Sequence, residues 1–384
     1  MNPSSFTSEE RGRVLKDPAG FWAFHPEPLP RTLALPQETA TLLDQATGAV
    51  NQLGGLGLLL PNPHLLIAPH MRLEAIQSSR IEGTQTDVDE LLRYEAGDES
   101  IASGVGDAEE VSNYIKAMEH GLQRISSLPV SARLLREIHG VLLNNVRGQN
   151  KAPGELRKSQ VWIGGSTAEN AVFTPPPPDG MQKSMDELER FLHDRSLPLL
   201  VQLALAHYQF ECIHPFLDGN GRVGRLMIPL LLIERGVLPQ PLLYLSAFFE
   251  RNRDEYYDHL LATSLHGDLL PWVSFFLKGV LEQTADAKER TLRLVELQKS
   301  MREELLAETN SKSVLQLLDH LFSAPVIDSK RAVALLGVTP PTALKAIAKL
   351  EEMGYLKEVT GQSRNRLYAA QNIMAAIYQE SVDW

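Results

Sequence analysis

The chain has 384 residues, which suits about two or three domains, and its 43% hydrophobic and 22% charged residues are ordinary for a globular protein. A net charge of −11 excludes a protein that binds nucleic acid over its whole surface. The single cysteine excludes an internal disulfide, and residues 1–13 lack the apolar stretch of a signal peptide. The strongest apolar run stops at Glu234 and is too short to span a bilayer. We therefore expect a cytoplasmic protein with no membrane partner.

The N-terminal part of the chain predicts an extended arm followed by helices. Prolines within residues 26–30 indicate the arm, and apolar residues recur at helical spacing from about Glu38 to Gln52. Residues 70–82 predict a second helix, which Gly83 would end. Two further helical stretches are expected within residues 108–147.

Residues 150–180 interrupt this helical pattern. Glycines and prolines surround the short β-type segment at 161–163, which predicts a hairpin. Helical periodicity returns over residues 182–213. After a glycine-rich loop, the helical pattern continues over residues 226–233. Phe248 to Leu261 predicts another helix.

The C-terminal part predicts a connecting helix and a small separate unit. Residues 282–308 are charged and contain neither glycine nor proline. Residues 312–370 then predict helix, helix, turn, helix and a hairpin, with Thr339 before Pro340 as a helix N-cap. This order resembles a winged helix-turn-helix.

Two kinds of partner stay open for this C-terminal unit. Basic side chains on its third helix and in its hairpin loop would suit DNA phosphates. Nearby glutamates and the acidic chain instead favour a protein partner or a homodimer. The basic residues are Lys345, Lys349, Arg364 and Arg366, and the glutamates are Glu351 and Glu352.

The densest chemistry lies in residues 214–225, which read His-Pro-Phe-Leu-Asp-Gly-Asn-Gly-Arg-Val-Gly-Arg. Glycines let backbone N–H groups approach an anion, and arginines suit phosphate oxygens. Asp218 is a ligand type that Mg²⁺ prefers, and His214 can move a proton near neutral pH. The loop therefore predicts a polyphosphate held beside a nucleophile.

The same loop contains the pattern G-x-G-x-x-G at residues 219–224, which is also the dinucleotide-binding fingerprint. That fingerprint requires a preceding strand within a βαβ unit. Here Val201, Leu205 and Tyr208 have helical spacing. We therefore predict helix, loop, helix and reject a dinucleotide site.

The loop resembles the signature of the Fic family, H-P-F-x-[D/E]-G-N-G-R-x-x-R, at every specified position. The resemblance implies a mainly α fold that transfers AMP from ATP to Ser, Thr or Tyr hydroxyls of protein targets, including the chain itself. His214 would be the general base, and Asp218 would hold Mg²⁺ with the ATP substrate.

The resemblance also implies the residues that contact ATP and the target. The glycine-rich turn would cradle the phosphates, and the two arginines would neutralise them. The implied ATP-binding set is Asp218, Gly219, Asn220, Gly221, Arg222, Val223, Gly224, Arg225, Asn252 and Tyr256. A β-hairpin flap within Arg157 to Gly165 would hold the target backbone. Its central residues are Val161, Trp162, Ile163 and Gly164.

Residues 78–83, Ser-Ser-Arg-Ile-Glu-Gly, match the inhibitory motif of this family, [S/T]-x-x-x-E-[G/N]. The resemblance implies that Glu82 pairs with Arg225 and keeps ATP out of a reactive pose, with Ser78 at the start of the motif. Two alternatives stay open. Glu82 would position water to remove AMP from a modified protein, or the chain would be a DNA-binding regulator that uses the fold as a nucleotide sensor.

We therefore expect a mainly α protein with four parts. These are an arm and helix at 1–60, a Fic catalytic domain at 61–281 with its inhibitory helix near 70–83, a connecting helix at 282–309, and a winged helix-turn-helix at 310–384.

Overall fold

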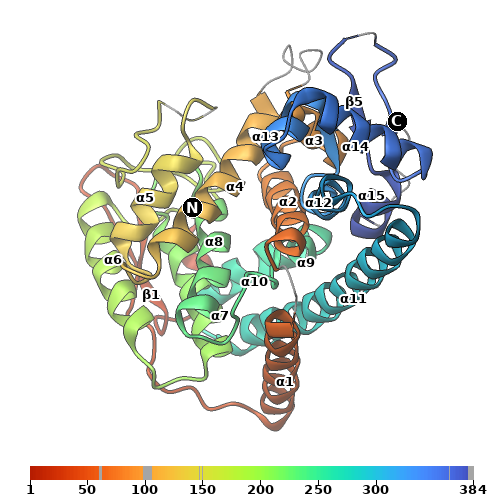
Figure 1. Ribbon diagram of the computed structural model, residues 1–384. Coiled ribbons are helices and arrows are strands. Elements are labelled where there is room, and N and C mark those ends of the chain that lie inside the picture. The colour runs from red at the N-terminus through yellow and green to blue at the C-terminus, as the bar shows by residue number, and fades with distance from the viewer. Residues whose placement is uncertain (60–62, 98–105, 147, 149, 363, 379–384) are drawn as a thin grey trace.

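The computed structural model describes residues 1–59, 63–97, 106–146, 148, 150–362 and 364–378 (Figure 1). Fifteen α-helices and two small sheets lie within these residues, which confirms the mainly helical class. In the described part of the chain no single helix has the length and hydropathy to cross a membrane. Only the pair Ser329–Leu336 and Pro340–Glu352, bent by 109°, meets those criteria jointly.

The N-terminal segment contains a hairpin that the proline-rich pattern did not predict. Strands β1 (Gly12–Lys16) and β2 (Trp22–Pro26) pair antiparallel, with Val14 opposite Phe24. The Phe24 side chain is buried, and its backbone N–H donates to the Thr174 carbonyl at 2.9 Å. The hairpin therefore packs beside the segment predicted to be the flap.

Eleven helices follow before the C-terminal unit. They are α1 (Gln37–Leu59), α2 (Pro63–Ile81), α3 (Val88–Ala96), α4 (Gly106–Arg124), α5 (Ala132–Leu142), α6 (Pro178–His193), α7 (Leu199–Ile213), α8 (Asn220–Glu234), α9 (Ser246–Arg251), α10 (Arg253–His266) and α11 (Leu270–Glu308). The helical stretch predicted at 182–213 is divided into α6 and α7 just before Leu199, because Pro198 cannot continue a helix. The helix predicted from Phe248 is likewise divided, at Asn252.

Helices α7 and α8 form the centre of the first hydrophobic core. Nearly every residue of both helices is buried, so neither shows a polar face. Helix α2 contacts α4, α8 and α9, which places the predicted inhibitory segment against this core. Figure 1 shows α2 between the catalytic helices and the C-terminal elements.

Helix α11 has 39 residues and begins at Leu270 rather than at residue 282. Its Trp272 is buried in the first core, whereas Met301 and Leu305 belong to the second. The predicted connecting helix is therefore one continuous element shared by both cores, and Figure 1 shows it running between them.

The C-terminal unit surrounds the second core. Its elements are α12 (Lys312–Leu321), β3 (Val326–Asp328), α13 (Ser329–Leu336), α14 (Pro340–Glu352), β4 (Lys357–Glu358), β5 (Leu367–Ala369) and α15 (Gln371–Tyr378). The sheet order is β3-β5-β4 with antiparallel pairs, so the predicted hairpin is β4 and β5. Strand β3 and helix α15 were not predicted, and the winged helix stays a prediction.

Polar contacts join this unit to α2. Arg72 forms an ion pair with Glu95 at 2.8 Å and donates from Nη1 to the Ser323 carbonyl at 2.6 Å. Arg331 donates to the Glu95 carbonyl at 3.2 Å. Helix α2 is thus held on one side by the first core and on the other by the C-terminal unit.

Candidate active site

The predicted loop joins two helices, which confirms the rejection of a dinucleotide site. Helix α7 ends at Ile213 and α8 begins at Asn220. His214 takes a left-handed conformation with φ of 48°, and Gly219 takes one with φ of 75°. The Asn220 amide binds the backbone of Phe216 through both its oxygen, at 2.8 Å, and its nitrogen, at 2.9 Å. Asn220 therefore fixes the shape of the loop.

A buried arginine holds the start of this loop. The Arg157 side chain is 2% exposed, and its Nε donates to the His214 carbonyl at 2.8 Å. Other guanidinium nitrogens donate to the carbonyls of Ser159, Pro176 and Ile213. Burial lowers the pKa of Arg157 to about 10, so the side chain stays cationic at neutral pH.

A buried histidine holds the other end of the loop. Gly154 N–H donates to His139 Nδ1 at 2.9 Å, so Nε2 carries the proton and donates to the Asp218 carbonyl at 3.0 Å. The His139 ring stacks on Phe216 with centroids 3.9 Å apart. Burial lowers the pKa of His139 to about 4, which keeps this neutral form.

The His214 ring is prepared to accept a proton. Its Nδ1 lies 3.3 Å from the Glu211 carbonyl, which can only accept, so Nδ1 carries the proton and Nε2 has the free lone pair. Burial and the nearby Arg157 cation lower the pKa of His214 to about 4. The imidazole is therefore neutral at physiological pH, as a general base requires.

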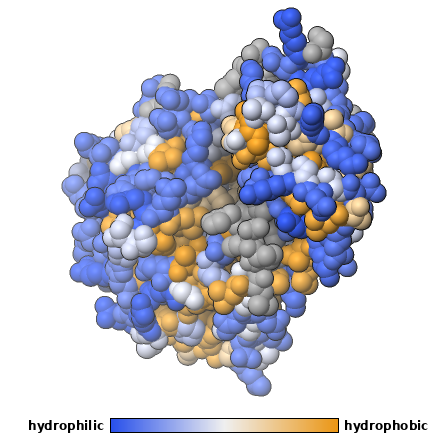
Figure 2. All heavy atoms as spheres, in the orientation of Figure 1, coloured by the Kyte–Doolittle hydropathy of each residue, from blue (hydrophilic) through white to orange (hydrophobic). Residues whose placement is uncertain are grey.

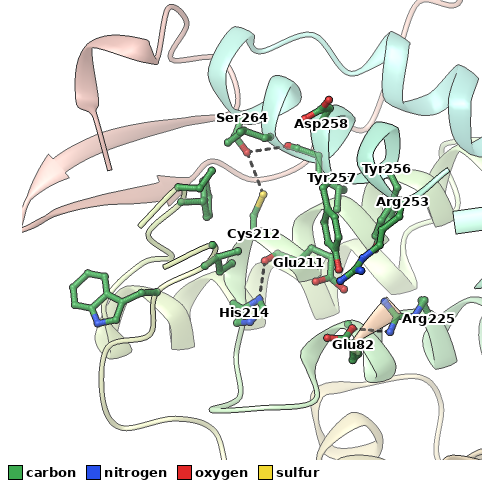
Figure 3. A pocket seen from close by; sticks show the side chains of 18 residues that line it. Glu82, Glu211, Cys212, His214, Arg225, Arg253, Tyr256, Tyr257, Asp258 and Ser264 are labelled. Atoms are coloured by element: carbon green, nitrogen blue, oxygen red, sulfur yellow. Dashed lines mark hydrogen bonds and ion pairs between the residues drawn. The ribbon is translucent and has the colours of Figure 1, made fainter. Parts of the chain in front are cut away.

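A pocket of about 590 Å³ opens beside His214 (Figure 3). This volume is in the range that suits a nucleotide-sized ligand. Of the predicted site residues, it is lined by Glu82, Trp162, Ile163, Gly164, His214, Gly221, Arg225 and Tyr256. Among the described residues, the remaining predicted ones lie outside its lining: Ser78, Val161, Asp218, Gly219, Asn220, Arg222, Val223, Gly224 and Asn252.

The turn that directly follows α2 contributes the carboxylate that faces Arg225. Arg225 is 2% exposed, and its Nη2 lies 2.7 Å from Glu82 Oε1. The same guanidinium donates from Nε to Ser78 Oγ at 2.8 Å and from Nη2 to the Ser78 carbonyl at 2.9 Å. Figure 3 shows Glu82 pointing toward Arg225, with His214 on the opposite side of the pocket.

The Glu82 carboxylate also lies against the first turn of α8. A Cβ atom added to Gly221 would overlap Glu82 Oε1, so only glycine permits this approach. Burial raises the pKa of Glu82, but the charge and hydrogen bond of Arg225, together with the charges of Arg222 and His214, hold the pKa below its ordinary value. An anion therefore occupies the anion-binding end of α8.

Arg222 is directed away from this pocket. Its side chain is buried and forms an ion pair with Glu110 at 3.2 Å and a longer one with Asp218 at 3.5 Å. Val223 and Gly224 face the core, and a Cβ atom on Gly224 would overlap the Glu211 carboxylate. The structure thus brings Arg225, but not Arg222, to the pocket.

The predicted flap differs from a regular hairpin. Ile163 pairs with Phe173 in one isolated antiparallel bridge, so residues 157–165 do not form a hairpin on their own. Glycines on one arm and the prolines at 175–178 on the other prevent longer pairing. Trp162 packs edge-on against Phe21, with ring centroids 5.1 Å apart.

Of the two ATP-binding residues predicted outside the loop, Asn252 and Tyr256, only Tyr256 lines the pocket. The Asn252 amide donates to the Phe248 carbonyl at 2.9 Å and thereby ends α9. Tyr256 is buried, and its hydroxyl meets His207 Nε2 at 2.8 Å. The sequence analysis missed Arg253 and Tyr257, which line the pocket one helical turn apart.

Glu211 is a further pocket residue that the sequence analysis did not assign. Burial raises its pKa to about 8, and Glu82 acts in the same direction, whereas Arg225 opposes both. Its position in the last turn of α7, three residues before His214, was the only available signal.

Asp218 is the predicted Mg²⁺ ligand. Its side chain is 37% exposed, and its Oδ1 accepts the Gly219 N–H at 2.6 Å. The described residues contain no group of three or more His, Cys, Asp or Glu that would hold a metal. A single partly exposed carboxylate fits Mg²⁺ that takes its other ligands from phosphates and water.

The fold and the loop together define a class of protein. Residues 40–123 match the family described as Fic/DOC family N-terminal, and residues 129–232 match the Fic/DOC family itself. The chain therefore carries a Fic/DOC family N-terminal domain and a Fic/DOC family domain.

Relatives of similar sequence support this assignment. Proteins named protein adenylyltransferase Fic from Drosophila yakuba and Drosophila persimilis are 32% and 33% identical over 173 residues, or 44% of this chain. The aligned region spans only 30% and 29% of their own lengths.

Solved structures share the fold. A Fic family protein from Desulfovibrio desulfuricans has a TM-score of 0.56 at 20% identity, covering 88% of this chain and 97% of that one. A Fic domain containing signaling protein from Bacteroides thetaiotaomicron has a TM-score of 0.52 at 21% identity, covering 64% and 95%.

Proposed function

We propose that this protein transfers AMP from ATP to a hydroxyl group of a protein target and that Glu82 restrains the reaction. The contact between Glu82 and Arg225 at 2.7 Å, inside the pocket that contains His214, carries this proposal. The name of the Drosophila relatives, protein adenylyltransferase, supports the reaction class.

The chemistry follows from His214. A Ser, Thr or Tyr hydroxyl of the target attacks the α-phosphorus of ATP, and pyrophosphate leaves. His214 Nε2 takes the hydroxyl proton as the new P–O bond forms, a contribution of about 10²–10⁴ in rate. Asp218 would hold Mg²⁺, which offsets phosphate charge when it is bound. The backbone of Gly221 and the Arg225 guanidinium would position the phosphates.

The proposed brake acts on Arg225. Contacts with Ser78 and Glu82 occupy the Nε and Nη2 donors of this guanidinium, so a phosphate would have to displace Glu82 to use Nη2. The Glu82 carboxylate also repels phosphate anions at the end of α8, and repulsion is strong in a partly buried pocket. ATP would then bind in a pose that is unfit for attack.

The enzyme proposal is tested by incubation with ATP and Mg²⁺. We expect proteins to gain the mass of AMP, and self-modification to appear as the same gain on this chain. His214→Ala should abolish the gain. An equal gain with His214→Ala would contradict the assigned base. Labelled ATP added to a cell extract with the Glu82→Gly protein would identify the targets.

AMP removal is a second candidate function. Glu82 is 32% exposed and lines the same pocket as His214, so it has room to hold water beside a modified target. Under this proposal wild type should release AMP from a modified target, and the Glu82→Gly protein should not. Equal release by both proteins would exclude it.

For the C-terminal unit we propose a protein partner, or a second copy of the chain, rather than DNA. Lys349 is paired with Glu308 at 3.8 Å and Glu352 at 3.2 Å, which removes it from phosphate binding. Leu335 and Leu344 are exposed, and Figure 2 shows hydrophobic side chains near α13. Salt-dependent binding of a DNA duplex to the full chain would contradict this proposal.

A further inference from the structure

A second cavity lies beside the middle of α2, whereas the catalytic pocket lies beyond the C-terminal end of this helix. It has a volume of about 170 Å³ and is enclosed by α2, α9, α11 and α15. The two cavities share no lining residue. The residues that carry the argument are Glu74, Gln77, Tyr244, Asp286, Arg290 and Tyr378.

Three polar atoms in this lining have no hydrogen-bond partner within the part of the chain that the structure describes. They are the hydroxyls of Tyr244 and Tyr378 and the side-chain oxygen of Gln77. Both tyrosines are 8% exposed, so bulk water does not solvate them freely. Buried polar groups are nearly always satisfied, so unsatisfied ones gathered around one cavity indicate a bound molecule.

The lining also holds a cation that is poorly neutralised. Arg290 donates from Nε to the Ile377 carbonyl at 3.1 Å. Burial lowers the pKa of Arg290, and Asp286 offsets only part of this effect. Asp286 itself accepts from the Gln283 amide at 3.2 Å. The guanidinium therefore suits an anionic group of a ligand.

The other carboxylate of the lining is already engaged. Glu74 accepts from Tyr114 Oη at 2.8 Å, from Ser246 Oγ at 2.5 Å and from Ser246 N–H at 3.2 Å. Its charge acts on Tyr244, whereas the charge of Arg290 acts on Tyr378. The cavity thus has a cationic end at Arg290 and an end at Tyr244 and Gln77, where the Glu74 carboxylate is already hydrogen-bonded.

We propose that this cavity binds a small organic acid. Its anionic group would meet Arg290 and Tyr378, and a hydroxyl or amino group would meet Tyr244 and Gln77. Such a ligand satisfies all three unpartnered atoms and neutralises the guanidinium.

The site is connected to the proposed brake through one face of α2. His70, Glu74 and Ser78 are spaced four residues apart along α2, and Glu82 follows directly after the helix ends at Ile81. A ligand that binds the cavity in this arrangement stabilises it, including the contact of Glu82 with Arg225. The ligand would therefore strengthen the brake, a consequence that rests on the proposed function.

Binding is tested first, without any activity assay. The full chain is titrated calorimetrically with glycine, lactate, malate, glutamate and inorganic phosphate. We expect at least one organic acid to bind, and Tyr378→Phe and Tyr244→Phe each to weaken it by about tenfold. Both variants should keep the thermal stability of the free protein, because neither hydroxyl has a partner among the described residues.

Tyr355→Phe is the matched control. Its hydroxyl donates to Glu304 at 2.7 Å, away from the cavity, so this variant should bind with unchanged affinity. Three results would overturn the site: no acid binds, only inorganic phosphate binds, or both cavity variants bind as wild type does. If no acid binds, the cavity holds water; if only phosphate binds, it is not a site for an organic acid; if both cavity variants bind as wild type does, the acid binds elsewhere.

The connection to the brake is tested second. The acid that binds should lower AMP incorporation by wild type and leave the Glu82→Gly protein unaffected. Equal inhibition of both proteins would overturn the connection while the binding result stands. If no variant transfers AMP, the proposed function fails, and calorimetry still decides the site.

Discussion

One contact holds the backbone of His214, and a second orients its ring. Arg157 binds its carbonyl, and the Glu211 carbonyl fixes the proton on Nδ1. The ring therefore keeps Nε2 free for a substrate proton. Its lowered pKa makes the ring a weaker base but keeps it in the neutral form at physiological pH.

The pH dependence of transfer follows from this pKa. Because the pKa of His214 is lowered to about 4, the neutral base should be lost only as the pH falls through about 4. The rate of AMP transfer by the Glu82→Gly protein should stay level from about pH 7 to about pH 5.5 and then fall. A midpoint near 6.5 would show an ordinary, unburied histidine.

Arg157 should matter for stability as well as position. Arg157→Met leaves the carbonyls of Ser159, Pro176, Ile213 and His214 without their donor. We expect the free energy of unfolding to fall by about 2–4 kcal/mol in denaturant titrations. Arg136→Met removes one carbonyl contact, with Gly154, and a half-exposed ion pair with Glu155, and should cost less than Arg157→Met, about 1 kcal/mol. Equal losses would contradict the role of Arg157.

At the scale of elements, α2 and α8 meet where an anion binds. Helix α8 offers the turn at Gly221, and α2 fills it with Glu82. Ser78 strengthens the contact through Arg225 Nε. The proposed brake is thus a contact between α8 and the C-terminal end of α2, with two parts of unequal strength.

Ser78→Ala should weaken the brake without removing it. The variant loses the bond to Arg225 Nε, but the Ser78 carbonyl and Glu82 remain. We expect AMP incorporation to rise by a few-fold, on the order of 1 kcal/mol, and less than for Glu82→Gly. Ser79→Ala, on the next residue of the helix, is the control and should not change incorporation. A decrease with Ser78→Ala would contradict this contact.

How far the sequence predicts the elements depends on how local their causes are. Helices α7 and α8 were predicted because apolar spacing and one contiguous motif lie within them. The β1–β2 hairpin was missed, since its pairing depends on Phe24 packing beside the flap. Ile163 pairs with Phe173, which lies outside the predicted flap at 157–165 but inside the stretch 150–180 where a hairpin was predicted.

The site shows the same limit. The loop was readable because its twelve residues are consecutive. The residues that hold the loop in place could not be predicted, because they are far away in the sequence. Arg157 is 57 residues from His214, His139 is 79 from Asp218, and Glu110 is 112 from Arg222. Only the fold brings these residues together. The orientation of Arg222 toward Glu110 follows from that packing and from no local pattern.

At the scale of the whole molecule, two cores share α11, and α2 lies between them. The cores contain titratable groups with strongly shifted pKa values. Burial lowers the pKa of His70 and His207 to about 3 and that of His139 and His214 to about 4. Burial raises the pKa of Glu74 to about 7 and of Glu211 to about 8.

These shifts predict a stability maximum. Between about pH 4 and 6.5 the unfolded histidines bind protons that the folded ones do not, so stability falls as the pH decreases. Between about pH 4.5 and 8 the folded glutamates bind protons that the unfolded ones release, so stability falls as the pH rises. Four histidines outweigh two glutamates below about pH 6.5. Unfolding free energies should therefore peak near about pH 6.5, and a steady rise to pH 8 would contradict these shifts.

The restraint of AMP transfer by Glu82 is the central claim, and one comparison tests it most directly. Labelled AMP incorporation is measured for wild type and Glu82→Gly under the same ATP and Mg²⁺, with the Glu82→Gly, His214→Ala double variant as the blank. Freeing Arg225 should raise incorporation by about tenfold or more, and the double variant should show none. Equal incorporation by wild type and Glu82→Gly would contradict the claim.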